Sequence, residues 1–414
     1  MLLLLALGVL SPTTSNALSS VAPPKNNVIA ITHASGRMGK LLALQLREDA
    51  SNRYQSRIQN TEDDTDASGD EETKKNDMEE HLPRIRAIVR SDQEAYSVRC
   101  DLGGMKMVGG AAQPMPCDWL ETVVVDHSKL DGSQREELLR TAFEGCKAAV
   151  LCDASHNELV WTEECSFEEN ENGSTESNED CGFRVVVPAS ESRDLSKRLL
   201  EEIDATKHST TLEHVVLRST MGLAVSEAAR AHDLYLQQQP AIPMEPGVDW
   251  RALANAMGGE AALSGPRTAE TAFGLVANAK STPKSRKHTV LRLGALTDDP
   301  GMVPLVFGRK DSILIKTADD GTQNYKPPIL SRSDAARISV MLVRSDDENN
   351  INGSDNINND LLTIDCAWHP SYGRDSVGRE EVVSAAARQN LDIRAILEAI
   401  PAVQPKQQEG ATVY

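Results

Sequence analysis

The sequence contains few aromatic residues, 4% of the chain, and its seven cysteines include no Cys-x-x-Cys pair. This cysteine spacing indicates neither a zinc site nor a disulfide framework, so we expect no metal. No basic stripe runs along the chain, which argues against nucleic acid as a partner. No apolar run reaches the roughly 20 residues that a transmembrane helix needs, so we expect no membrane span.

The net charge of −19 is concentrated in three acidic stretches. They cover about residues 59–80, 163–181 and 346–360, and together they hold 23 acids and two lysines. Such composition cannot bury enough apolar surface to offset the entropy of ordering, so we predict three disordered surface inserts. The rest of the chain is near neutral and is long enough for one large core or two modest ones.

Short apolar segments alternate with helical patterns along the rest of the chain. Strands are predicted at residues 27–32, 84–89, 122–125, 148–151, 215–217 and 289–293, with a further one at 183–187. Helices are predicted directly after the first strand, to residue 48, and at 134–146, 194–205 and 268–279. This alternation predicts an α/β fold with a doubly wound parallel sheet. We expect a smaller substrate or lid region at about 223–288, and a last strand and helix in 361–414 that complete the domain.

The turn after the first strand carries the first binding motif. Unpaired amides and the dipole at a helix start favour a pyrophosphate, and small residues let it come close to the backbone. We therefore predict that this turn binds a dinucleotide through Thr32, Ser35, Gly36, Arg37, Met38 and Gly39.

This turn and the motifs that follow it resemble the atypical, NmrA-like branch of the short-chain dehydrogenase/reductases. The family's turn reads TGATGxxG, and further matches follow in the family's order: Arg90 and Asp126 after the second and third strands, GCKAAVLC at 145–152, EHVVLRSTMG at 213–222, TVLRLGALTDDPG at 289–301 and LSRSDAA at 330–336. The resemblance implies an NAD(P)-binding Rossmann domain over residues 27–345. His33 departs from the pattern, because it stands where the family has its first glycine.

The residue after the second strand bears on the choice of cofactor. A carboxylate there usually accepts from the ribose hydroxyls of NAD, whereas an arginine can pair with a 2′-phosphate. Arg90 therefore favours NADP over NAD, unless it is only a solvated charge at a strand end. The resemblance also places Asp126, His127, Ala154 and Ser155 beside the cofactor, although Asp126 could instead cap the next helix.

The family's reductases use a Tyr-xxx-Lys pair as proton donor. The corresponding positions fall near Ala262 and Pro266, and neither residue can do this chemistry. Ser219 and Thr220 match the family's Ser-Ser and are weak candidates for holding a substrate carbonyl.

Two functions, and a third possibility, follow from this sequence. The first is an NADP-dependent oxidoreductase acting on an unknown small substrate. The second is a non-catalytic NADP-binding redox sensor or assembly factor, which the missing Tyr-Lys pair favours. A degenerate fold that serves only as an interaction surface is the third.

The amino end resembles a targeting segment. Residues 2–10 form an apolar run of signal-peptide length, and Ser15-Asn16-Ala17 offers small residues for cleavage after Ala17. The junction resembles the bipartite plastid leaders of algae with secondary plastids, and a plastid supplies NADPH. We therefore expect residues 1–17 to direct the protein to a plastid, with the secretory pathway and ER lumen as the alternative.

Overall fold

The computed structural model describes residues 27–62, 82–108, 110–152, 158–161, 183–186, 192–227, 229–230, 250–299, 301, 305–308, 311, 313–314, 328–344 and 361–368. No helix in these ranges combines the length and the apolar character that crossing a bilayer requires. The predicted leader at 1–17 and the predicted inserts at 163–181 and 346–360 lie outside the described residues, as do residues 369–414.

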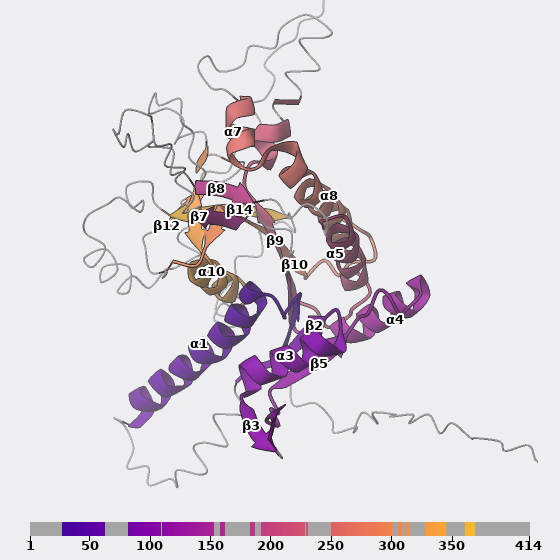
Figure 1. The fold of residues 1–414 in the computed structure, drawn as a ribbon, viewed down its shortest axis with the longest axis vertical. Helices are drawn as coiled ribbons and strands as arrows, with labels where there is room; N and C mark the ends of the chain where they lie inside the picture. The colour runs from indigo at the N-terminus through magenta and orange to yellow at the C-terminus, as the bar shows by residue number, and fades with distance from the viewer. Residues whose placement is uncertain are drawn as a thin grey trace, which may run out of the picture.

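An eight-stranded sheet forms the centre of the fold, in the order β12-β14-β10-β9-β6-β1-β2-β5. Its strands are β1 (Val28–Thr32), β2 (Arg84–Val89), β5 (Leu120–Val124), β6 (Ala148–Leu151), β9 (His214–Thr220), β10 (Lys287–Leu293), β12 (Leu305–Gly308) and β14 (Leu362–Trp368). All pair in parallel except β12, which is antiparallel to β14. The strand order reverses between β1 and β6, which is the doubly wound arrangement. The fold class predicted from the sequence is confirmed (Figure 1).

Helices cover both faces of this sheet. One face packs against α1 (Arg37–Glu62), α3 (Asp92–Gly103) and α10 (Arg332–Arg344), and the other against α4 (Gly132–Phe143), α5 (Ser192–Thr206) and α8 (Gly259–Ala277). Because side chains alternate along a strand, Ile29 and Ile31 enter the first core while Ala30 enters the second. The near-continuous apolar strands of the sequence are thus buried on two sides, as parallel strands usually are.

Smaller elements lie beyond this sheet. A four-stranded sheet has the order β13-β11-β7-β8. Its strands are β13 (Ile329–Ser331), β11 (Ala295–Thr297), β7 (Glu158–Trp161) and β8 (Phe183–Val186). The predicted strand at 183–187 is therefore present as β8, but it pairs with β7 outside the main sheet. The hairpin β3 (Met105–Val108) and β4 (Ala111–Pro114) precedes β5, and α7 (Trp250–Ala256) precedes α8.

Two boundaries differ from the sequence predictions. The first acidic insert was predicted at about 59–80, and α1 continues through Glu62, so the helix overlaps the first residues of that prediction. The lid region was placed at 223–288, but α8 buries Ala269, Phe273 and Val276 in the core beneath the sheet. That helix is amphipathic over its second half, so the burial of its apolar side attaches it to the sheet. The predicted lid range therefore includes residues of the core.

Candidate functional site

The turn between β1 and α1 is held tightly at the carboxyl edge of the sheet. Ala34 N donates to the carbonyl of Ile88 at 3.3 Å, and Gly36 N donates to the carbonyl of His33 at 3.1 Å. A Cβ on Gly39 would lie 2.6 Å from the Cα of Ala34, so no side chain fits there. The glycine at this position lets the start of α1 pack directly on the strand end, as a dinucleotide turn requires.

His33 brings a side chain into this turn. Its φ is 50°, in the left-handed region that glycine adopts without strain. A Cβ built on Gly36 would lie 3.0 Å from Cδ2 of His33, so the imidazole lies against the bare backbone of Gly36. The space that the glycine leaves open is therefore bordered by the histidine ring.

A hollow opens beside His33 at the carboxyl ends of β1, β2, β5 and β6. It is lined by His33, Ile88, Val89, Arg90, Val125, His127, Cys152, Arg198, Leu199 and Glu202. The last three residues belong to α5. The cavity measures about 20 Å³, which is room for a water-sized molecule.

Arg90 lines this hollow but already has an acidic partner. Its Nε donates to Oε1 of Glu94 at 2.6 Å, its Nη2 lies 2.5 Å from the same oxygen, and its backbone N donates to Oε2 at 2.9 Å. The pair is formed because α3 begins immediately after β2, which sets the two residues one helical turn apart. The sequence reasoning missed Glu94, although Ser91-x-x-Glu94 is a capping-box pattern that predicts a helix start.

Glu94 also contacts the turn between β1 and α1. Ser35 Oγ donates to its Oε2 at 2.9 Å, so this one carboxylate joins the first turn to the end of β2. Burial acts to raise the pKa of Glu94, but the hydrogen bonds from Arg90 and Ser35 outweigh it and the pKa lies below its ordinary value. A negative charge is therefore fixed where the ribose of a dinucleotide would come.

Asp126 and His127 follow β5 on the same edge. Asp126 accepts hydrogen bonds from Ser128 and lies 3.0 Å from Lys129, and these contacts hold its pKa far below the ordinary value. Asp126 thus closes its own turn and does not cap the next helix, because the N-cap of α4 is Asp131. His127 lines the hollow, and burial together with the nearby charge of Arg198 lowers its pKa, so the ring is neutral at pH 7.

Arg37, the first residue of α1, is paired across the molecule. Its Nη1 lies 2.5 Å from Oδ2 of Asp298, and the other carboxylate oxygen of Asp298 contacts Arg332, the first residue of α10. The sequence reasoning did not identify Asp298, because the contact spans 261 positions of the chain. An incoming phosphate would compete with this carboxylate for Arg37.

Two other residues of the turn that were predicted to bind the cofactor, Thr32 and Met38, make contacts within the fold. Thr32 is fully buried and its Oγ1 accepts from Cys152 N at 3.0 Å, which ties β1 to β6. The side chain of Met38 is in the core between α1 and the sheet. Ala154 and Ser155 lie outside the described residues.

The end of β9 carries the weak catalytic candidates. Ser219 and Thr220 are each 2% exposed, and Thr220 Oγ1 lies 3.4 Å from the carbonyl oxygen of Met221. The Tyr-Lys positions of the resemblance, near Ala262 and Pro266, fall on α8 and are buried apolar residues. Among the described residues no group of three or more His, Cys, Asp or Glu side chains could hold a metal ion.

Comparison with known proteins gives solved structures only, because no family model and no curated protein matches. The structure is similar to a wide-type short-chain dehydrogenase/reductase from Veillonella parvula in complex with NADP, at TM-score 0.38 and 10% identity over 85% of this chain and 98% of that one. It is similar to a Rossmann-fold NAD(P)-binding family protein from Shigella flexneri, at TM-score 0.37 and 10% identity over 86% and 99%. A third is a UDP-N-acetylglucosamine 4-epimerase from Bacillus cereus, at TM-score 0.32 and 14% identity over 86% and 83%.

Proposed function

We propose that the chain binds NADP(H) at the turn between β1 and α1 and acts as an atypical short-chain dehydrogenase/reductase on a small substrate. The observation that carries this is the glycine turn at the carboxyl edge of the sheet, beside the reversal of strand order between β1 and β6. Ligands of open α/β sheets bind at this point.

The charges at the rim decide between the two cofactors. Arg90 and Arg198 line the hollow and can pair with a 2′-phosphate. Glu94 opposes this, since it occupies Nε and Nη2 of Arg90. NADP(H) binding therefore requires Arg90 to exchange the carboxylate of Glu94 for the phosphate, while Glu94 unaided would favour the ribose hydroxyls of NAD.

Titration of the full chain with NADPH and NADH, by fluorescence and calorimetry, tests this proposal. We expect NADPH to bind more tightly, Arg90→Ala and Arg198→Ala to weaken NADPH by about tenfold each with little change for NADH, and Glu94→Gln to strengthen NADPH. Asp118→Asn, at an exposed residue away from the hollow, is the matched control. Equal affinities for both cofactors would remove the NADP assignment, and no binding of either would remove the dinucleotide site.

A non-catalytic role is the second candidate. It is favoured by the two buried apolar residues, Ala262 and Pro266, at the positions where a Tyr-Lys pair would supply the proton. A sensor or assembly factor would bind NADPH without oxidising it. Following the absorbance of NADPH in the presence of aldehydes, ketones and quinones distinguishes the two candidates. Oxidation of NADPH with any of these compounds would establish that the protein is an enzyme.

We also propose that residues 1–17 direct the protein to a plastid. The support is the apolar run at 2–10 followed by the small residues before Leu18. A fluorescent protein fused after residue 30 should collect in plastids of an algal host, and collection in the ER lumen would favour the secretory alternative.

A further inference from the structure

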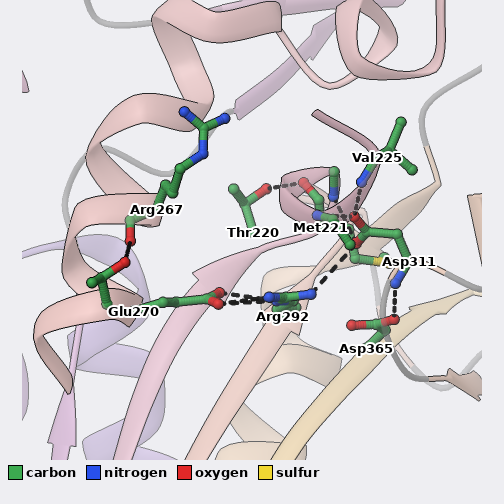
Figure 2. A network of polar contacts seen from close by, with 11 residues as sticks. Thr220, Met221, Val225, Arg267, Glu270, Arg292, Asp311 and Asp365 are labelled. Carbon is green, nitrogen blue, oxygen red and sulfur yellow. Dashed lines mark hydrogen bonds and ion pairs between the residues drawn. The ribbon is translucent and has the colours of Figure 1, made fainter. Parts of the chain in front are cut away.

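Figure 2 shows a network of charged residues around Arg292 of β10, Asp311 and Asp365 of β14. None of these residues lines the hollow beside His33. The centre of the network is Asp311, which is fully buried. Its Oδ1 accepts from Gly222 N at 2.8 Å, and its Oδ2 accepts from Ala224 N at 2.7 Å and Val225 N at 3.1 Å. Asp311 therefore fixes the turn that follows Ser219 and Thr220, using a carboxylate supplied from almost 90 residues further along the chain.

Asp365 of β14 holds Asp311 in turn. The backbone N of Asp311 donates to Oδ2 of Asp365 at 2.6 Å. The second oxygen, Oδ1 of Asp365, is buried and has no hydrogen-bond partner. A charged carboxylate oxygen without a donor is costly in the interior, whereas a protonated one loses most of that cost.

The neighbouring carboxyl groups also favour the protonated form of Asp365, whereas Arg292 opposes it. Asp365 faces Arg292 of β10, Asp311, and Glu270 of α8, and Cys366 follows it on β14 with its side chain in the opposite core. Arg292 bonds Glu270 through Nε at 3.0 Å and Nη2 at 2.7 Å, and its Nη1 lies 4.0 Å from Asp311. Three carboxyl groups therefore surround one guanidinium group. Glu270 and Asp311 lie closest to Arg292 and balance its positive charge, so little of that charge remains to stabilise an ionised Asp365.

Burial, and then the charge of Asp311, raise the pKa of Asp365 to about 7. Arg292 and the hydrogen bond from Asp311 N act to lower this pKa and offset the rise only in part. At slightly acidic pH Asp365 is neutral. It then accepts the hydrogen bond from Asp311 N without placing a second negative charge beside the Asp311 carboxylate.

We propose that Asp365 is a proton-dependent positioning residue: protonated, it holds Asp311 and thereby the Gly222–Val225 turn, and its ionisation loosens both. The turn carries the end of β9, where a substrate would meet Ser219 and Thr220, so one proton in the core sets how firmly that end is held.

Linkage fixes the sign of the effect. In the closed network Asp365 titrates near 7, and in an opened network it titrates near its ordinary value of 3.8. The closed form therefore binds more protons between these values, and its stability falls about tenfold per pH unit as pH rises through this window. Above about pH 7 the stability no longer changes with this group.

Hydrogen–deuterium exchange of the full chain without nucleotide tests the proposal. Protection factors of Gly222, Ala224 and Val225, corrected for the intrinsic rates, should fall about tenfold per unit between pH 5 and 7 and then level off. Asp365→Asn keeps an acceptor for the Asp311 amide and cannot ionise, so its protection should not vary with pH and should exceed that of the wild type at pH 8.

Two further variants keep the outcome decisive. Asp311→Ala should abolish the protection at every pH, and Asp118→Asn should behave as the wild type. A protection factor that is constant with pH in the wild type, or a pH dependence that survives in Asp365→Asn, would overturn the proposal. Because no nucleotide is present, this result is independent of whether the chain binds NADP(H).

Discussion

Gly36 has no side chain, yet Cδ2 of the His33 ring lies 3.0 Å from the position that a Cβ on Gly36 would occupy. The phosphates of a dinucleotide approach this backbone and need its amides. In the resembling family a glycine takes the place of His33, so its turn has no ring at this point. At the proposed site, we therefore expect the affinity for a dinucleotide to depend on whether this imidazole moves away.

We expect His33→Gly to bind NADPH about tenfold more tightly. The change removes the ring and relieves the φ of 50°, a conformation that costs a residue with a Cβ on the order of 1 kcal/mol. Fluorescence titration measures the gain, and His208→Gly, at another exposed turn, is the matched control. Weaker binding by His33→Gly would mean that the ring contacts the nucleotide.

Single residues were predicted where their neighbours in sequence define their role. Gly36 and Gly39 follow from the spacing of the turn, and Arg90 from its place after a strand. Glu94 and Asp298 were not found, because their roles depend on which arginine the fold brings to them. The capping-box pattern marks Glu94 as part of a helix start, but nothing in the sequence shows which arginine either carboxylate meets.

Among the elements, the β1–α1 unit depends most on a close approach of backbone. Gly39 packs against the Cα of Ala34 and the carbonyl oxygen of His33, at 2.6 and 2.8 Å from a Cβ that it does not have. Both contacts are with backbone atoms, so neither can be relieved by turning a side chain.

Gly39→Ala should therefore lower the free energy of unfolding by about 2–3 kcal/mol. Gly132→Ala is the matched control, because it lies in the first turn of α4 and its nearest neighbour, a nitrogen of Arg135, is 4.0 Å away. That control should be neutral or stabilising by up to about 1 kcal/mol, since alanine favours a helix. Urea unfolding measures both, and equal effects of the two substitutions would contradict the packing argument.

Six strands of the main sheet (β1, β2, β5, β6, β9 and β10) could be predicted because they are short apolar runs between helical patterns, but β12 was not. In the small sheet β8 was predicted and β11 and β13 were not, since these two are three residues long and pair across more than 30 positions. Strands of this length have too few residues to show a period. The helix α3 was missed for a different reason: its mean character is polar, with only Ala95, Val98 and Cys100 buried.

At the scale of the whole molecule, buried ionisable groups make stability depend on pH. Burial lowers the pKa of His288 to about 4, from 6.5, and Arg286 and His214 act in the same direction. Its ring lies edge-on to Phe273, with centroids 5.4 Å apart. Because the folded-state pKa is depressed, the stability that this residue contributes is present above pH 6.5 and is lost as pH falls towards 4.

We expect the wild type to lose about 2.5 kcal/mol through His288 between pH 7.5 and 4.5. His288→Leu cannot take up the proton, so the difference in unfolding free energy between the two proteins should shift by this amount. Asp365 changes stability in the opposite direction over the same range, which is why the comparison is made between variant and wild type. A gap that stays constant with pH would contradict the prediction.

The order of strands along the main sheet has a consequence for the growing chain on the ribosome. The last strand, β14, lies between β10 and β12, although β12 precedes it by more than 50 residues in the sequence. Residues 305–308 thus emerge with no neighbour to pair with and must wait for residues 362–368. The strands around the β1–α1 turn (β1, β2, β5 and β6) all precede residue 152, whereas the core beside them includes α10 and the Asp311–Asp365 network is complete only once residue 365 has been made.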